Sequence, residues 1–177
     1  VGAFASVALA MGLLPWAEDF TGIDTYLRLL EWSDLNRPLM QRLALEAPGT
    51  YAHTIAMANM VETACNAIGA NGLLGRAGTN YHDTGRIAYF LEKARERGDV
   101  TSPTAQEYAY PGPIPQSAET AVCMLADGCE AAARAMPEPT PQKLRDLVER
   151  IVAQRTEQGQ LRDAPLTLQQ LETVKEQ

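Results

Sequence analysis

Histidine and cysteine are both scarce in this 177-residue sequence, and their scarcity limits the sites that the chain can build. The three cysteines, Cys65, Cys123 and Cys129, form no CxxC pair and leave one thiol over in any pairing. This argues against a disulfide framework and fits a reducing, cytoplasmic location. The two histidines, His53 and His82, are the only imidazoles that the chain can offer to a metal ion.

Basic charge is also in short supply, with 15 Lys and Arg against 22 Asp and Glu and a net charge of −7. A duplex nucleic-acid partner is therefore disfavoured, because that contact depends on cationic side chains that neutralise phosphates. A small anionic ligand remains compatible with the composition. The sequence has no internal repeat, no low-complexity tract and no sustained alternation typical of strands. Its 46% apolar content is enough for one substantial core, so a single all-α domain is predicted.

The first seventeen residues carry no charge, and Glu18 is the first ionisable side chain. A membrane-spanning helix needs ~20 predominantly apolar residues. Residues 1–20 are therefore expected to be the end of a transmembrane or membrane-proximal helix that begins outside this chain, and residues 21–177 to form the domain. The alternative is a buried or interfacial helix of the domain itself.

Start and stop signals for helices divide the rest of the chain. Pro38 opens one helix, which Pro48 and Gly49 are expected to close, while Gly85 is placed to end the helix that Asn71 begins. The segment IAYFLEKARERG, residues 87–98, predicts a further short helix, and the Pro-rich stretch after it a surface loop. The expected N-terminal cap residues of the other helices are Thr50, Asn71, Ser117, Thr140 and Thr167.

Four polar side chains on three of these helices stand out: His53, His82, Asp83 and Asp127. The two histidines are expected to face inward and Asp127 to lie at the edge of an apolar face. Asp83 follows His82 at a helix end, from where both side chains can bend toward one ion. His53 shares an arc of about 100° with Met57 and other apolar residues of its helix. Mixed imidazole and carboxylate ligands suit Mn, Fe, Co, Ni or Zn rather than Ca or Mg. Taken singly, each histidine could instead be a hydrogen-bonded core residue and each aspartate a helix cap.

Three segments carry a resemblance to a known family: LLEWSDLNRPLMQRLALEAPGTYAHT, YHDTGR and YPGPIPQSAETAVCMLADGCEAAARA. They resemble the cytoplasmic HD domain of the bacterial seven-transmembrane HD hydrolases, the membrane-bound cyclic-di-AMP phosphodiesterases of the PgpH type. The likeness runs from about Leu27 to Lys175. It implies an HD-domain-like helical bundle at the cytoplasmic face of the bacterial inner membrane. It also implies that one divalent transition metal, Mn or Fe, is bound by the residues His53, His82, Asp83 and Asp127.

The sequence departs from the family after Arg86, which stands where the family has lysine. The helices that follow in the family carry further histidines, including a His-His pair for a second metal, and this chain has no such residues. The domain is therefore expected to be shortened after residue 86 and to keep one metal site.

The resemblance implies phosphodiester hydrolysis of a cyclic dinucleotide, with Asp83 and Arg86 in catalytic roles and Arg86 and Tyr110 in contact with the substrate. Tyr110 begins the YPGPIP segment and would stack on a base, although that segment could equally be a rigid connector. The loss of the second-metal histidines should impair this activity. The chain would act either alone or with ligands lent by a partner subunit in a homo-oligomer. The alternatives are an inactive nucleotide-binding or sensor module of a membrane protein, and a defective deletion product.

Overall fold

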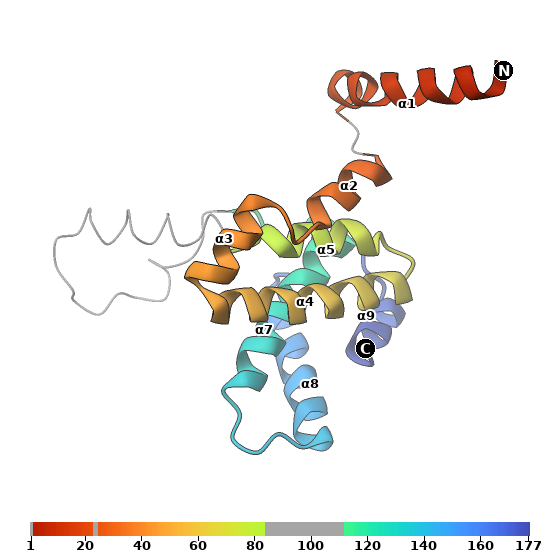
Figure 1. Ribbon diagram of the computed structural model, residues 1–177. Coiled ribbons are helices and arrows are strands. Elements are labelled where there is room, and N and C mark those ends of the chain that lie inside the picture. The colour runs from red at the N-terminus through yellow and green to blue at the C-terminus, as the bar shows by residue number, and fades with distance from the viewer. Residues whose placement is uncertain (1, 23–24, 84–111) are drawn as a thin grey trace, which may run out of the picture.

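The computed structural model describes residues 2–22, 25–83 and 112–177, and these residues form helices and connections without a strand (Figure 1). The prediction of an all-α fold is confirmed. The expected helix at residues 87–98, the helix end at Gly85, and the side chains of Arg86 and Tyr110 lie outside the described residues. The helices are α1 (Gly2–Thr21), α2 (Tyr26–Ser33), α3 (Pro38–Glu46), α4 (Pro48–Ala67), α5 (Gly72–Tyr81), α7 (Ala118–Arg134), α8 (Pro141–Glu157) and α9 (Leu168–Lys175).

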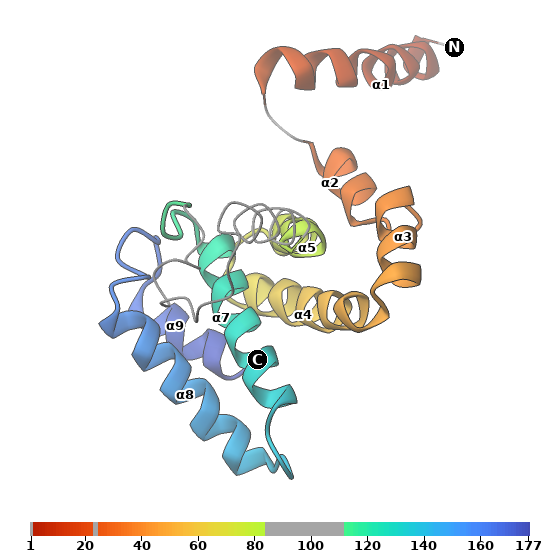
Figure 2. The same ribbon diagram turned by 90° about the vertical axis from the view of Figure 1, so that its left-hand side faces the viewer.

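Helix α4 is the centre of the bundle, and it packs against α3, α5, α7 and α9 (Figure 2). Its buried apolar side chains meet α7 in one core cluster, made of Met57, Val61, Ala64, Cys65 and Val122. A second cluster joins α7 to α8 and consists of Leu125, Leu147, Ile151 and Val152. These buried apolar side chains fix how α4 and α7 are rotated about their axes. The rotation in turn determines where the polar side chains next to the apolar faces point.

Four of the predicted cap residues begin helices in the structure. Asn71 accepts a hydrogen bond from the Leu74 amide at 3.0 Å and so caps α5. Ser117, Thr140 and Thr167 accept in the same way from the amides three residues further on. Each bond satisfies an amide that has no partner inside its helix, and a cap of this kind stabilises a helix by ~1 kcal/mol.

The predicted boundary between the third and fourth helices was wrong. Pro48 does not end a helix but occupies the first turn of α4, and Ala47 stands at the N-cap position without a side-chain hydrogen bond. Proline lacks the amide hydrogen that residues inside a helix donate, but residues of the first turn have no partner within the helix for this hydrogen. Proline can therefore stand either just after a helix or in its first turn. Thr50 therefore lies inside α4 and caps nothing, and His53 falls in the second turn of α4 rather than the first.

Helix α1 stands away from the bundle in both views (Figures 1 and 2). Its large apolar side chains are exposed, among them Phe4, Trp16 and Phe20, so α1 contributes nothing to the two core clusters. Glu18 is the buried residue of α1, and its carboxylate accepts a hydrogen bond from the Thr25 amide at 3.1 Å. None of the helices in the described part of the chain is both long and apolar enough to cross a membrane.

Candidate metal centre

Glycine at position 75 lets α5 lie close against α4. A Cβ atom built on Gly75 would be 2.9 Å from Val61 Cγ1 and 3.1 Å from Cys65 Sγ, both on α4. Cβ atoms essentially never approach other atoms within 3.0 Å, so only glycine allows this packing without a shift. The close approach brings His82, at the C-terminal end of α5, beside His53 of α4, with ring centroids 5.4 Å apart.

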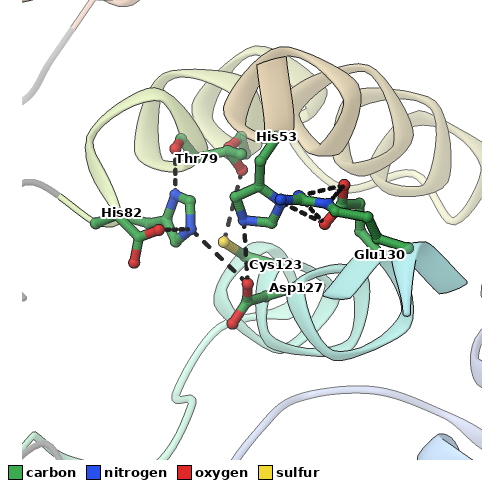
Figure 3. A network of polar contacts seen from close by, with 9 residues as sticks. His53, Thr79, His82, Cys123, Asp127 and Glu130 are labelled. Atoms are coloured by element: carbon green, nitrogen blue, oxygen red, sulfur yellow. Dashed lines mark hydrogen bonds and ion pairs between the residues drawn. The ribbon is translucent and has the colours of Figure 1, made fainter. Parts of the chain in front are cut away.

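Helix α7 adds a carboxylate to the two imidazoles (Figure 3). Asp127 Oδ1 lies 3.3 Å from His53 Nε2 and 3.9 Å from His82 Nε2, and one ligand atom of each residue lies within 4.8 Å of the other two. Two ligands of one ion, each ~2.2 Å from it, can be at most about 4.4 Å apart. Both distances to Asp127 fall inside that limit. Three of the four predicted metal ligands therefore converge.

Asp83, the fourth predicted ligand, lies at the edge of this group. Its Oδ2 atom is 3.3 Å from His82 Nε2. It follows His82 directly at the end of α5, where the helix gives way to a turn and neighbouring side chains can approach one another. The carboxylate lies on the His82 side of the centre, so any role as a ligand remains a prediction.

The hydrogen bond at the back of His82 fixes which ring nitrogen carries the proton. Nδ1 lies 2.7 Å from the Thr79 carbonyl oxygen, and a carbonyl can only accept, so Nδ1 must donate. In the neutral ring Nε2 then presents a lone pair. This atom is buried and has no hydrogen-bond partner among the described residues. A buried imidazole nitrogen without a hydrogen bond is unusual in a folded protein, and it is well suited to bind a cation.

His53 is held in the same way by a residue that the sequence did not single out, Glu130 of α7. Its Oε2 atom lies 2.5 Å from His53 Nδ1, which leaves Nε2 directed at Asp127. Burial raises the pKa of the Glu130 carboxyl, but hydrogen bonds from Arg134 and His53 outweigh burial and lower that pKa below its usual value. Glu130 follows Asp127 by three residues, a spacing that places both on one face of a helix and could have pointed to it.

The donor set fits a single ion. Two imidazole nitrogens with free lone pairs and a carboxylate oxygen come from three helices, and such mixed ligands suit Mn, Fe, Co, Ni or Zn. In both rings the Nδ1–H group donates a hydrogen bond to an oxygen, and proteins commonly orient the histidine ligands of metals in this way. The described residues thus bring three candidate ligands together at one possible metal site.

A cavity of about 490 Å³ opens beside the centre. His82 and Asp127 lie on its wall, and Leu74, Gly78 and Met124 provide apolar surface. This volume lies within the ~300–1,000 Å³ typical of small-molecule sites. A ligand in the cavity would therefore reach the atoms that face the candidate metal position.

Comparison with known proteins gives closely agreeing results, although no protein-family model matches the chain. The cyclic-di-AMP phosphodiesterase PgpH of Bacillus subtilis is 34% identical over 98% of this chain and 33% of its own length. PgpH of Listeria monocytogenes is 28% identical over 99% of this chain and 33% of its length. The uncharacterized protein slr0104 of Synechocystis is 31% identical over 94% of this chain and 29% of its length. The chain thus spans about a third of the length of these relatives.

Two solved structures share the fold. The crystal structure of the L. monocytogenes PgpH HD domain superposes with a TM-score of 0.68 at 26% identity, covering 80% of this chain and 95% of that one. The same domain in complex with cyclic-di-AMP also gives a TM-score of 0.68, at 25% identity over 81% of this chain and 95% of that one. The helical bundle and its His-Asp centre define an HD-type domain. The chain belongs to the family of HD domains found in the PgpH-type cyclic-di-AMP phosphodiesterases, as the three sequence segments predict.

The alignment with the B. subtilis relative extends over 236 positions, whereas this chain has 177 residues. Part of the aligned stretch of that relative therefore has no counterpart here. Such a difference in length is what an internal deletion produces.

Proposed function

We propose that the chain is the metal-dependent hydrolytic domain of a phosphodiesterase that acts on a cyclic dinucleotide, with cyclic di-AMP as its substrate. The observation that carries this proposal is the convergence of His53 Nε2, His82 Nε2 and Asp127 Oδ1. Two of these residues, His82 and Asp127, lie on the wall of a cavity. Two relatives named as cyclic-di-AMP phosphodiesterases, and an HD domain solved with that nucleotide, support the choice of substrate.

In this proposal one Mn or Fe ion is held by His53, His82 and Asp127, with Asp83 joining from the edge. A bound divalent ion supplies Lewis-acid activation of water and of a phosphoryl oxygen. Asp83 and Arg86 take the catalytic roles, and the planar guanidinium of Arg86 binds phosphate. Tyr110 stacks on a base.

The chain cannot complete a second metal site of the family type, because it has no histidine beyond His53 and His82. Loss of one preorganised electrostatic group commonly costs ~2.7–4 kcal/mol of barrier, or about 10²- to 10³-fold in rate. Slow turnover is therefore part of the proposal. The same shortage of histidine favours the second candidate, a module that binds the nucleotide without hydrolysing it. The length of the alignment with the B. subtilis relative supports a deletion, which we place after residue 86.

We further propose that residues 1–20 are membrane-proximal, so that the domain works at the cytoplasmic face of the bacterial inner membrane. The exposed apolar side chains of α1 support this placement, because such a surface favours contact with lipid or protein over water. A second copy of the chain is the simplest source of the metal ligands that this chain lacks.

The test measures bound metal and turnover in the same preparations. Elemental analysis should find about one Mn per chain after loading, and His82→Ala should remove it. Single-turnover hydrolysis of cyclic di-AMP in Mn²⁺ should be slow and should disappear in Asp127→Asn, while the matched surface variant Asp163→Asn should behave as wild type. Absence of metal from the wild-type chain, or unchanged turnover in Asp127→Asn, would refute the proposal. Nucleotide binding without any turnover would establish the second candidate instead.

A further inference from the structure

We infer that Glu130 is a positioning residue that keeps a proton on His53 Nδ1, so that Nε2 is the ring nitrogen left to bind a metal, and that Arg134 holds Glu130 in place. Nothing in the sequence pattern or in the names of the relatives assigns a role to either residue. The inference rests on the proposed metal centre for its consequence, but the tautomer itself can be measured without any metal.

The tautomer follows from the chemistry of the contact. A carboxylate has only acceptor atoms, and Glu130 Oε2 is 2.5 Å from His53 Nδ1. If the proton were on Nε2, the lone pair of Nδ1 would face the negatively charged oxygen at this short distance. The proton therefore belongs on Nδ1, where it is shared in a charge-assisted hydrogen bond. Nε2 lies 3.3 Å from Asp127 Oδ1, on the side of His82, and is the ring nitrogen that can give its lone pair to an ion bound there.

Arg134 restrains the carboxylate from the other side. It lies one turn after Glu130 on α7, and its Nη2 atom is 2.5 Å from Oε1 and 2.6 Å from Oε2, with Nε 3.1 Å from Oε1. The glutamate side chain is only 15% exposed, so water competes weakly for these bonds. A planar guanidinium fixes the plane of a carboxylate better than a point charge would. Arg134, Glu130 and His53 form a chain of contacts. Figure 3 shows Glu130 on the side of the His53 ring away from His82.

The other histidine, His82, is oriented by a backbone group instead of a side chain. His82 receives the same restraint from the Thr79 carbonyl, which belongs to the backbone and cannot be removed by substitution. For His53 the restraining group is a side chain. Among the described residues, Glu130 is thus a side chain whose substitution can change the tautomer of His53 without changing His53 itself.

The first measurement is the tautomer of His53 in the metal-free protein, read from the ¹⁵N shifts of its ring nitrogens. The wild-type chain should show the proton on Nδ1. Glu130→Ala should shift the population toward the Nε2–H form, whereas Glu130→Gln should retain part of the wild-type form because its amide oxygen can still accept. Glu46→Gln is the matched control, since Glu46 pairs with Arg42 at the same spacing on an exposed helix face. A wild-type ring without a proton on Nδ1 would overturn the inference, even if every variant failed to fold.

The second measurement is Mn²⁺ affinity by calorimetric titration. Loss of a residue that orients a metal ligand typically weakens metal binding ~10–100-fold. We expect a loss of that size in Glu130→Ala, a smaller loss in Glu130→Gln and in Arg134→Leu, and none in Glu46→Gln. Wild-type affinity in Glu130→Ala would overturn the inference. If the wild-type chain binds no Mn²⁺, the proposed function fails, and the tautomer measurement still decides the role of Glu130.

Discussion

Replacement of Gly75 by alanine tests the packing that brings the two histidines together. The added methyl group would lie 2.9 Å from Val61 Cγ1 and 3.1 Å from Cys65 Sγ, two atoms of the central helix α4 that are themselves buried. Neither side chain can swing away into solvent, so α5 must shift from α4. Such overpacking typically costs ~1–3 kcal/mol.

Gly78, one turn further along α5, provides the control. A Cβ built there meets no atom within 4 Å. Both substitutions gain the same intrinsic preference of alanine over glycine in a helix, about 1 kcal/mol, so the difference between the two variants isolates the steric term. Gly75→Ala should therefore be less stable than Gly78→Ala by about 1–3 kcal/mol.

Urea unfolding followed by circular dichroism measures the difference. With a denaturant slope of ~1–3 kcal/mol/M, a gap of about 2 kcal/mol should separate the two midpoints by about 1 M. The double variant Gly75→Ala with Val61→Ala should recover part of the loss, because it removes the methyl group at 2.9 Å, and the two changes should not be additive. Equal midpoints for Gly75→Ala and Gly78→Ala would refute the claim that glycine is needed for the close contact of α4 and α5.

Two further properties follow from ionisable groups outside the metal centre. Burial raises the pKa of the Glu119 carboxyl, but hydrogen bonds led by the Asn71 amide at 2.9 Å outweigh it and lower that pKa. A lowered pKa gives stability that is present above the unfolded value of ~4.3 and is lost as pH falls through the folded value, so the wild-type chain should lose more stability between pH 5 and 3 than Glu119→Gln does in thermal melts. Parallel curves would contradict this. Burial is the main cause that raises the pKa of the Cys65 thiol to about 12, so at pH 8 iodoacetamide should label it far more slowly in the native chain than in the urea-unfolded chain, as mass spectrometry can show. Equal labelling rates would show that Cys65 is accessible in the fold.

Local signals in the sequence predicted those parts of the fold that local chemistry decides. Asn71 and Ser117 begin helices because their side chains accept hydrogen bonds from amides three residues away, and such a bond depends on nothing distant. Pro48 misled the prediction for a local reason as well, since proline is compatible with both sides of a helix boundary. The inward direction of His53 followed from its spacing to Met57, and both residues are buried.

The role of Glu130 could not be predicted in the same way. It stands 77 residues from His53 in the sequence, and the two meet only because α4 packs across α7. The three-residue spacing from Asp127 places Glu130 on the same face of α7, but it does not show that this face meets His53. Asp127 was found because its charge interrupts an apolar face, whereas Glu130 is followed by Arg134 and has the spacing of an ordinary surface ion pair. The roles predicted for Arg86 and Tyr110 remain predictions.

The hydrogen bond from His82 to the Thr79 carbonyl makes one half of the centre depend on backbone shape alone. Any residue at position 79 offers the same oxygen, provided that the last turn of α5 stays wound. Substitution of Glu130 can therefore change the orientation of the His53 ring, whereas an intact His82 ring loses its orienting hydrogen bond only when that turn unwinds. A force applied to the chain just after Asp83 would act on this turn directly. It would remove the hydrogen bond that orients His82 without changing the chemistry of any side chain.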